Sequence, residues 1–224
     1  MNNNRLYLKN WPYNAALIMD ELHNIVENNG GKVKPHTGAP TVISNHTLDS
    51  AIRKTTDRLN QLEAIEAEKP GQNQHRTEAI KQYRADLEKW QHIDNTPREV
   101  RHTTWSASYI TFTLDNMLYY YDTDDNPFFE FHYKKTPIAK DGTVSRDAYL
   151  MEDKKEWLYD CFMRFDTSDA DRKEAANLIY NMLVKAPVSE IYREKRRMRV
   201  PNMYNNGYHY ETVYEKERRE KVSF

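Results

Sequence analysis

Residues 109 to 133 read YITFTLDNMLYYYDTDDNPFFEFHY, and this stretch decides the fold. Its first residues alternate between polar and apolar side chains, as in a strand with one buried face: Ile110, Phe112 and Leu114. Asp115 and Asn116 follow, and both residue types tolerate positive φ, which predicts a two-residue hairpin turn. We therefore expect an antiparallel β-meander, with return strands at 117–121 and 128–133, a turn at 122–127 and a candidate fourth strand at 98–104.

Helices are predicted on both sides of this meander. Apolar residues recur at helical spacing after Pro12, and Gly30 and Gly31 supply the stop. Two shorter apolar stripes follow the meander, at 157–165 and 175–183. The second is preceded by Ser168 and Asp171, whose spacing predicts a capping box at the helix start. Together these patterns predict an α+β fold with helices packed on an antiparallel sheet.

The segment between residues 48 and 95 has a different pattern. Narrow apolar stripes run through two charged stretches, and Pro70 and Gly71 separate them. The stripes are Leu48, Ile52, Thr55, Leu59 and Leu62, and then Ala79, Tyr83, Leu87 and Trp90. They predict an antiparallel, coiled-coil-like helical hairpin. We expect this hairpin to be inserted into an α+β body formed by residues 1–47 and 96–224.

Composition narrows the class of protein. Thirty-three Lys and Arg against 34 Asp and Glu leave a net charge of −1, unlike a general nucleic-acid coat or a membrane-surface protein. The single cysteine, Cys161, excludes an internal disulfide framework, and its place on an apolar stripe predicts burial. The N-terminal residues lack a signal-peptide pattern, and no apolar run is long enough to span a membrane. We expect a cytoplasmic protein without a membrane partner or a cofactor.

The main candidate site lies near the C-terminus, where basic residues precede tyrosines. Its residues are Arg193, Lys195, Arg196, Arg197, Arg199, Tyr204, Tyr208 and Tyr210. Cations contact phosphates and aromatic rings stack on bases, so this combination favours nucleic-acid binding. Two other interpretations stay open. The cations can belong to a solvated helix end, or they can pair internally with the acidic stretch 141–171, which holds nine acids and four bases.

A weaker candidate site lies on the meander. Asp122, Glu130 and His132 fit a metal-dependent phosphodiesterase or nuclease, in which side chains on adjacent strands hold a cation that activates water. The same stretch imitates the start of a calcium loop. That similarity fails because Pro127 and Tyr133 stand where the loop needs Gly and Glu.

The function expected from the sequence is therefore binding rather than catalysis. We expect an accessory or inhibitory factor that contacts nucleic acid or a nucleoprotein complex through the basic and aromatic C-terminal residues. The first alternative is a protein–protein interaction module, in which the helical hairpin at 48–95 binds another protein or a second copy of the chain. The second alternative is the metal-dependent phosphodiesterase or nuclease.

Overall fold

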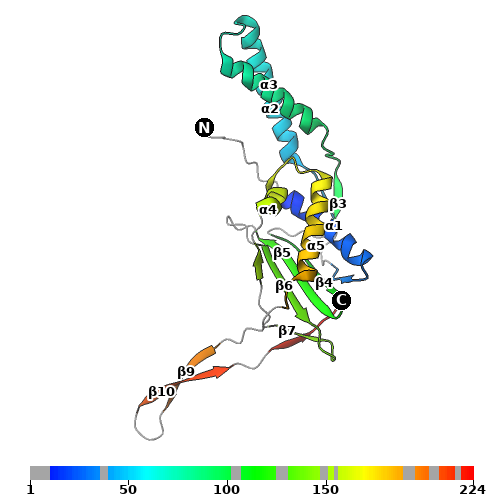
Figure 1. Cartoon of the computed structure of the whole chain (residues 1–224), viewed down its shortest axis with the longest axis vertical. Coiled ribbons are helices and arrows are strands. Elements are labelled where there is room, and N and C mark those ends of the chain that lie inside the picture. Colours follow the sequence, from blue (N-terminus) through cyan, green and yellow to red (C-terminus); the bar gives the residue numbers. More distant parts are fainter. Residues whose placement is uncertain are drawn as a thin grey trace. The chain divides into compact units, whose positions relative to one another are not determined.

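The computed structural model describes most of the chain, and Figure 1 shows its elements. The described residues are 11–35, 40–101, 107–124, 131–146, 151–153, 156–188, 195–201, 207–214 and 218–224. Within them the chain forms five helices: α1 (Trp11–Asn28), α2 (His46–Glu68), α3 (Gln74–Gln91), α4 (Glu156–Met163) and α5 (Asp169–Lys185). The α+β fold class expected from the sequence is confirmed.

Eleven strands accompany the helices in the described ranges, and the pairs β1–β4, β2–β3, β5–β6, β6–β8, β7–β11 and β9–β10 are antiparallel. They are β1 (Lys32–Val33), β2 (Thr41–Ile43), β3 (Arg98–Val100), β4 (Ala107–Leu114), β5 (Met117–Asp124), β6 (Phe131–Pro137), β7 (Thr143–Ser145), β8 (Met151–Asp153), β9 (Lys195–Pro201), β10 (Tyr208–Tyr214) and β11 (Arg219–Lys221). The main sheet has the order β1-β4-β5-β6-β8. Three two-stranded sheets pair β10 with β9, β11 with β7, and β2 with β3.

The chain divides into two compact units. The first contains Met1–Leu22, His36–Ser108 and Lys155–Leu178, and the second contains His23–Pro35, Tyr109–Lys154 and Ile179–Phe224. The first unit therefore holds the α2 and α3 pair, and the second holds most of the main sheet. The body and insertion boundaries expected at 47/48 and 95/96 remain a prediction.

The predicted turn between the first two meander strands is confirmed. Asp115 and Asn116 have φ values of 49° and 61°, which is the left-handed geometry of a type I′ hairpin turn. Ile110 and Phe112 are fully buried on β4, and the Phe112 ring stacks on that of Tyr119, with 4.8 Å between centroids. This pairing places the apolar face of β4 in the core of the second unit.

Two predicted strand assignments were wrong. Strand β5 continues to Asp124, so residues 122–124 of the turn expected at 122–127 belong to the strand, and residues 125–127 lie outside the described ranges. In the segment 98–104, expected as a fourth meander strand, residues 98–100 form β3, which pairs with β2 in a separate sheet, and residues 102–104 lie outside the described ranges. Val100, on β3, instead packs with Tyr13, Ala16 and Leu17 of α1 in the first unit. The residues expected to begin the third strand, 128–130, lie outside the described ranges, and β6 continues to Pro137.

Helices α2 and α3 pack against each other in the first unit. Leu59 of α2 is buried with Ile80 and Leu87 of α3, and half-buried apolar residues flank them: Ile52, Leu62, Tyr83 and Trp90. Ion pairs join Glu63 to Arg84 and Glu66 to Arg76, so positions advance along one helix as they retreat along the other. The two helices are therefore antiparallel. Their role as a protruding arm remains a prediction.

Each of these helices begins at an asparagine cap. The side chain of Asn45 accepts a hydrogen bond from the Leu48 amide at 3.0 Å, and that of Asn73 accepts one from the Arg76 amide at 3.2 Å. Such caps satisfy backbone donors that have no partner within the helix. At the other end of α3, Trp90 packs edge-to-face on Phe165, with 5.0 Å between ring centroids.

The contact between α2 and α3 gives a first prediction. Leu59→Ala and Leu87→Ala should each lower the free energy of unfolding by about 2–4 kcal/mol, because each leaves a cavity in a small apolar seam. Ile65→Ala is the matched control on α2, since the Ile65 side chain is 44% exposed. Urea unfolding followed by circular dichroism measures all three. Equal losses for Leu59→Ala and Ile65→Ala would contradict the described packing.

Candidate functional site

The basic C-terminal residues lie on a two-stranded ribbon formed by β9 and β10 in the second unit (Figure 1). The register pairs Arg199 with Tyr210, Arg197 with Thr212, and Lys195 with Tyr214. The interpretation of this run as a solvated helix end is wrong, because residues 195–201 form a strand. Arg193 and Tyr204 lie outside the described residues.

The ribbon separates the basic residues into two sets. Positions on a strand alternate between faces, and antiparallel partners share a face. One face therefore holds eight positions, which we call the basic face: Lys195, Arg197, Arg199, Pro201, Tyr208, Tyr210, Thr212 and Tyr214. The other face holds the positions of Arg196, Met198, Val200, His209, Glu211 and Val213. The basic face has three cations and no acid, whereas Arg196 pairs in register with Val213 on the opposite face.

Two further observations concern this surface. Tyr208 is 57% exposed, so at least one aromatic residue of the basic face is open to solvent. In addition, three acids of the stretch 141–171 have partners elsewhere in the first unit. Asp166 pairs with Lys89 and Arg164, Asp169 pairs with Arg98 and Arg172, and Asp171 accepts hydrogen bonds from Ser168. Three of the nine acids in that stretch therefore have partners within the first unit.

The weaker candidate site takes a different form in the structure. Asp122 on β5 is the register partner of His132 on β6, and His132 is the register partner of Glu152 on β8. Glu130, the third residue expected from the sequence, lies outside the described residues. The hydroxyl of Tyr120 donates a hydrogen bond to the Asp122 carboxylate. Among the residues whose side chains are described, no three His, Cys, Asp or Glu form a metal-binding group.

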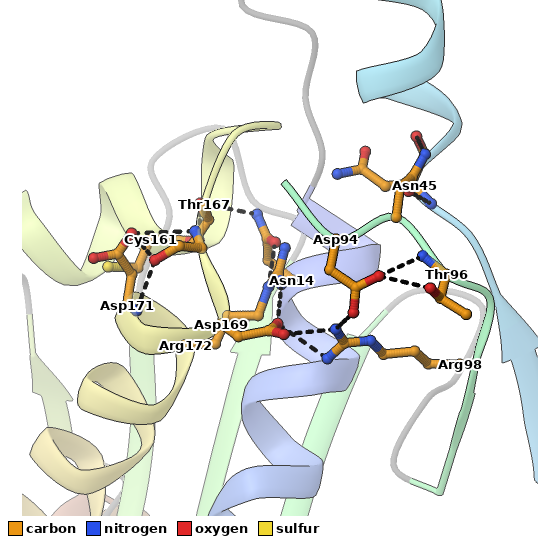
Figure 2. Close-up of polar contacts among 12 residues, drawn as sticks. Asn14, Asn45, Asp94, Thr96, Arg98, Cys161, Thr167, Asp169, Asp171 and Arg172 are labelled. Atoms are coloured by element: carbon orange, nitrogen blue, oxygen red, sulfur yellow. Dashed lines mark hydrogen bonds and ion pairs between the residues drawn. The ribbon is translucent and has the colours of Figure 1, made fainter. Parts of the chain in front are cut away.

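A polar network holds α1, α5 and the residues before β3 together within the first unit (Figure 2). Arg172 of α5 is only 2% exposed, and it donates hydrogen bonds to the Asn14 side chain at 3.1 Å and to Asp169 at 2.7 Å. Asp169 also accepts from both guanidinium nitrogens of Arg98, at 2.6 and 3.0 Å. Arg98 in turn donates to Asp94 at 2.7 Å. The network therefore alternates cations and carboxylates.

The loop before α5 is closed by hydrogen bonds to the same asparagine. The Asn14 amide nitrogen donates to the carbonyls of Phe162 and Arg164, at 2.9 and 2.6 Å. The predicted capping box is confirmed, because the Asp171 carboxylate accepts from the Ser168 amide and hydroxyl while Ser168 accepts from the Asp171 amide. The arrangement orders a helix start and offers no reactive group.

The electrostatics of the network match its structural role. Burial acts to raise the pKa of Asp169, but the hydrogen bonds and charges of Arg98 and Arg172 together outweigh it and hold that pKa below its usual range. The hydrogen bond to Asp169 raises the pKa of Arg98 in turn. Burial lowers the pKa of Arg172, and Asp169 opposes that shift. Asp169 therefore stabilises two cations, one of them buried.

Comparison with protein-family models, with curated proteins and with solved structures finds no match.

In the part of the chain that the structure describes, no helix is both long enough and apolar enough to cross a membrane.

The network gives a second prediction. Asp169→Asn should lower the free energy of unfolding by about 2 kcal/mol, because the buried Arg172 guanidinium loses its carboxylate. Solvent screening keeps the loss near the lower end of the usual range, since Asp169 is itself partly exposed. Asp94→Asn is the control, because Asp94 also binds Arg98 but is largely solvent-exposed. It should change stability much less than Asp169→Asn.

The same pair of variants tests the pH dependence. Because the folded-state pKa of Asp169 is depressed, its contribution to stability is complete above the unfolded-state pKa of about 3.9. That contribution is lost as the pH falls through the lower folded-state pKa. The stability difference between wild type and Asp169→Asn should therefore shrink below about pH 4. A difference that grows in acid would contradict this role.

Cys161 gives a third prediction. Burial raises the pKa of its thiol to about 12, so the reactive thiolate is scarce near neutral pH. The folded protein should react with iodoacetamide at pH 8 at least 100-fold more slowly than the urea-unfolded chain, in which the pKa is about 8.5. Mass spectrometry of quenched samples measures both rates. Similar rates in the two states would contradict the described burial.

Proposed function

We propose that this protein binds nucleic acid through the basic face of the β9–β10 ribbon. The register is the observation that carries the proposal. It aligns Lys195, Arg197 and Arg199 along one strand and sets Tyr210 and Tyr214 opposite two of them on the neighbouring strand. If cations and acids were mixed along these strands, the cations would not share a face that has no acid. The segregation of cations with tyrosines favours a ligand that is both anionic and aromatic.

The shape of the ribbon suits such a ligand. A two-stranded antiparallel ribbon fits the major groove of duplex DNA, where its residues reach phosphates and base edges. Successive cations on one face are two residues apart, about 6.6 Å along the strand. This spacing is close to the distance between successive phosphates of an extended nucleic-acid backbone. Tyrosines offer rings for unpaired bases, so single-stranded DNA and RNA belong in the same test as duplexes.

The charge of the chain limits the expected strength of binding. Three cations on the basic face give a salt dependence with a slope of log K against log salt near −3. A net charge of −1 adds no general attraction to nucleic acid. The protein is therefore suited to local contact at an assembled complex rather than to coating a long polymer. This supports a role as an accessory or inhibitory factor.

The opposite face of the ribbon is compatible with that role. Met198, Val200 and Val213 hold positions on it, and they are residue types that pack against protein. One face then has the composition of a nucleic-acid contact and the other that of a protein contact. Such a division fits a factor that acts where protein and nucleic acid meet.

The fourth prediction compares two neighbouring arginines on β9. Arg197→Ala should reduce the salt slope of binding by about 1, because it removes a phosphate contact from the basic face. Arg196→Ala is the matched control on the opposite face and should leave the slope unchanged. Fluorescence anisotropy with labelled duplex DNA, single-stranded DNA and RNA across a salt series measures the slopes. Circular dichroism establishes that both variants fold.

Two outcomes would contradict the proposed function. The first is an absence of binding by the folded wild-type protein to every probe at low salt. The second is equal weakening by Arg196→Ala and Arg197→Ala, which would mean that total charge, and not the basic face, determines binding.

A further inference from the structure

We propose that the paired helices α2 and α3 bind a second copy of this chain, so that two helix pairs form an antiparallel four-helix bundle. The residues that carry the inference all belong to the first unit, and their side chains are described. The inference is independent of the β9–β10 ribbon and of nucleic-acid binding.

Exposed residues form a row along one side of α2, which we call the α2 row. Its five members are Lys54, Arg58, Gln61, Ile65 and Glu68. They are separated by gaps of four, three, four and three residues. Such spacing keeps side chains on one side of a helix, because each residue turns an α-helix by about 100°. The α2 row therefore presents one continuous strip to solvent.

The α2 row lies on the side of the helix pair opposite the ion pair between Glu63 and Arg84. Around α2, the half-buried Leu62 lies between the row and the buried Leu59, whereas Glu63 lies beyond Leu59. Around α3, Tyr83 and Arg84 flank the buried seam on opposite sides. Because Glu63 and Arg84 meet on one side, the row and Tyr83 share the other. Since the two helices lie side by side (Figure 1), a second helix pair that packs on this side contacts both of them.

Apolar surface is available on this side of the helix pair. Ile65 is 44% exposed. Three other apolar residues on this side are half-buried: Leu62, Ala79 and Tyr83. Asp86 lies one turn after Tyr83, and the Gln82 amide donates to its carboxylate at 2.9 Å. Burying the apolar side chains favours association, but their area is small, so we expect a weak dimer that depends on concentration.

The charges of the α2 row favour a second copy of the same row in antiparallel orientation. Lys54 and Arg58 precede Gln61, and Glu68 follows it. Lys54 and Glu68 each lie seven residues from Gln61, so a two-fold axis near Gln61 places Lys54 of each copy opposite Glu68 of the other. In a parallel arrangement, like charges would meet at both ends of the row.

The charged residues of the α2 row are available for these contacts. Lys54 and Glu68 are exposed, and neither has an ion-pair partner among the residues that the structure describes. Arg58 donates to Gln61 at 3.2 Å, which holds its guanidinium within the row. In the antiparallel arrangement the apolar stem of Arg58 covers Ile65 of the second copy, because the two residues lie at similar distances on either side of Gln61.

Sedimentation velocity of the full chain over a concentration series tests the proposal with two variants. Lys54→Glu combined with Arg58→Glu makes every charge in the row negative, and Glu68→Lys makes every charge positive. Each variant alone should dimerise about tenfold more weakly than wild type, because like charges then meet at both ends. An equimolar mixture of the two should associate at least as strongly as wild type, since a negative row then meets a positive one.

The matched control combines Arg53→Glu with Lys81→Glu. Both residues are exposed and lie off the side that carries the row, and the control changes the net charge by as much as Lys54→Glu with Arg58→Glu. Its dimer should stay within about twofold of wild type at physiological salt, where charges away from the contact are screened.

Three results would overturn the proposal: a wild-type protein that stays monomeric at its highest soluble concentration, a dimer that neither row variant weakens, or a mixture that associates no better than its components. Nuclear magnetic resonance on wild-type protein decides the matter if a variant does not fold. In a mixture of isotope-labelled and unlabelled chains, contacts between copies should join the Ile65 methyl groups to the Arg58 side chain. Contacts between copies at other residues alone would identify a different interface and overturn the assignment.

Discussion

Strand register is the constraint on which the proposed binding surface depends. Because side chains alternate along a strand, shifting one strand by a single residue would move each of its residues to the other face. On the main sheet, the positive φ values of Asp115 and Asn116 make a tight turn whose length sets the pairing of β4 with β5. The pairing of β5, β6 and β8 then aligns Asp122, His132 and Glu152. On the ribbon, register separates Arg196 from Arg197 and Arg199.

The first unit relies on a different kind of interaction. Its elements meet around the buried guanidinium of Arg172, which binds Asn14 and Asp169. A buried charge is costly unless it is paired and hydrogen-bonded, and here its partners hold α1 and α5 together. Its carboxylates are fully used by structural partners. For this reason we assign function to the ribbon, and a structural role to the network.

The sequence predicted those parts of the fold that local patterns encode. The alternation at Ile110 and Phe112, the Asp115–Asn116 turn, and the apolar stripes of α2 and α3 all follow from short-range periodicity. The ribbon was harder to predict. Lys195 to Arg199 has no apolar alternation and few residues with high strand propensity, so its charge pattern suits a helix end as well as a strand. The pairing of residues 195–201 with residues 208–214 is what identifies the segment as a strand.

Two other features escaped prediction for related reasons. Arginine is seldom fully buried, and nothing in the local sequence marks Arg172 as different from its exposed neighbours. Its partners, Asn14 and Asp169, include one that is 158 residues away in the chain. Glu152 likewise becomes the register partner of His132 through a pairing of strands that no spacing rule encodes. Local sequence patterns indicate the type of element, but they do not show which distant segments of the chain pair with each other.

The most direct test of the central claim observes the arginines of the ribbon individually. Nuclear magnetic resonance resolves the side-chain Nε–Hε signals of Arg196, Arg197 and Arg199, and each can be followed while a short DNA duplex or single strand is added. The register predicts that the signals of Arg197 and Arg199 shift together with the bound fraction while that of Arg196 stays in place. Equal shifts at all three arginines, or shifts confined to Arg196, would contradict the claim that the basic face is the binding surface.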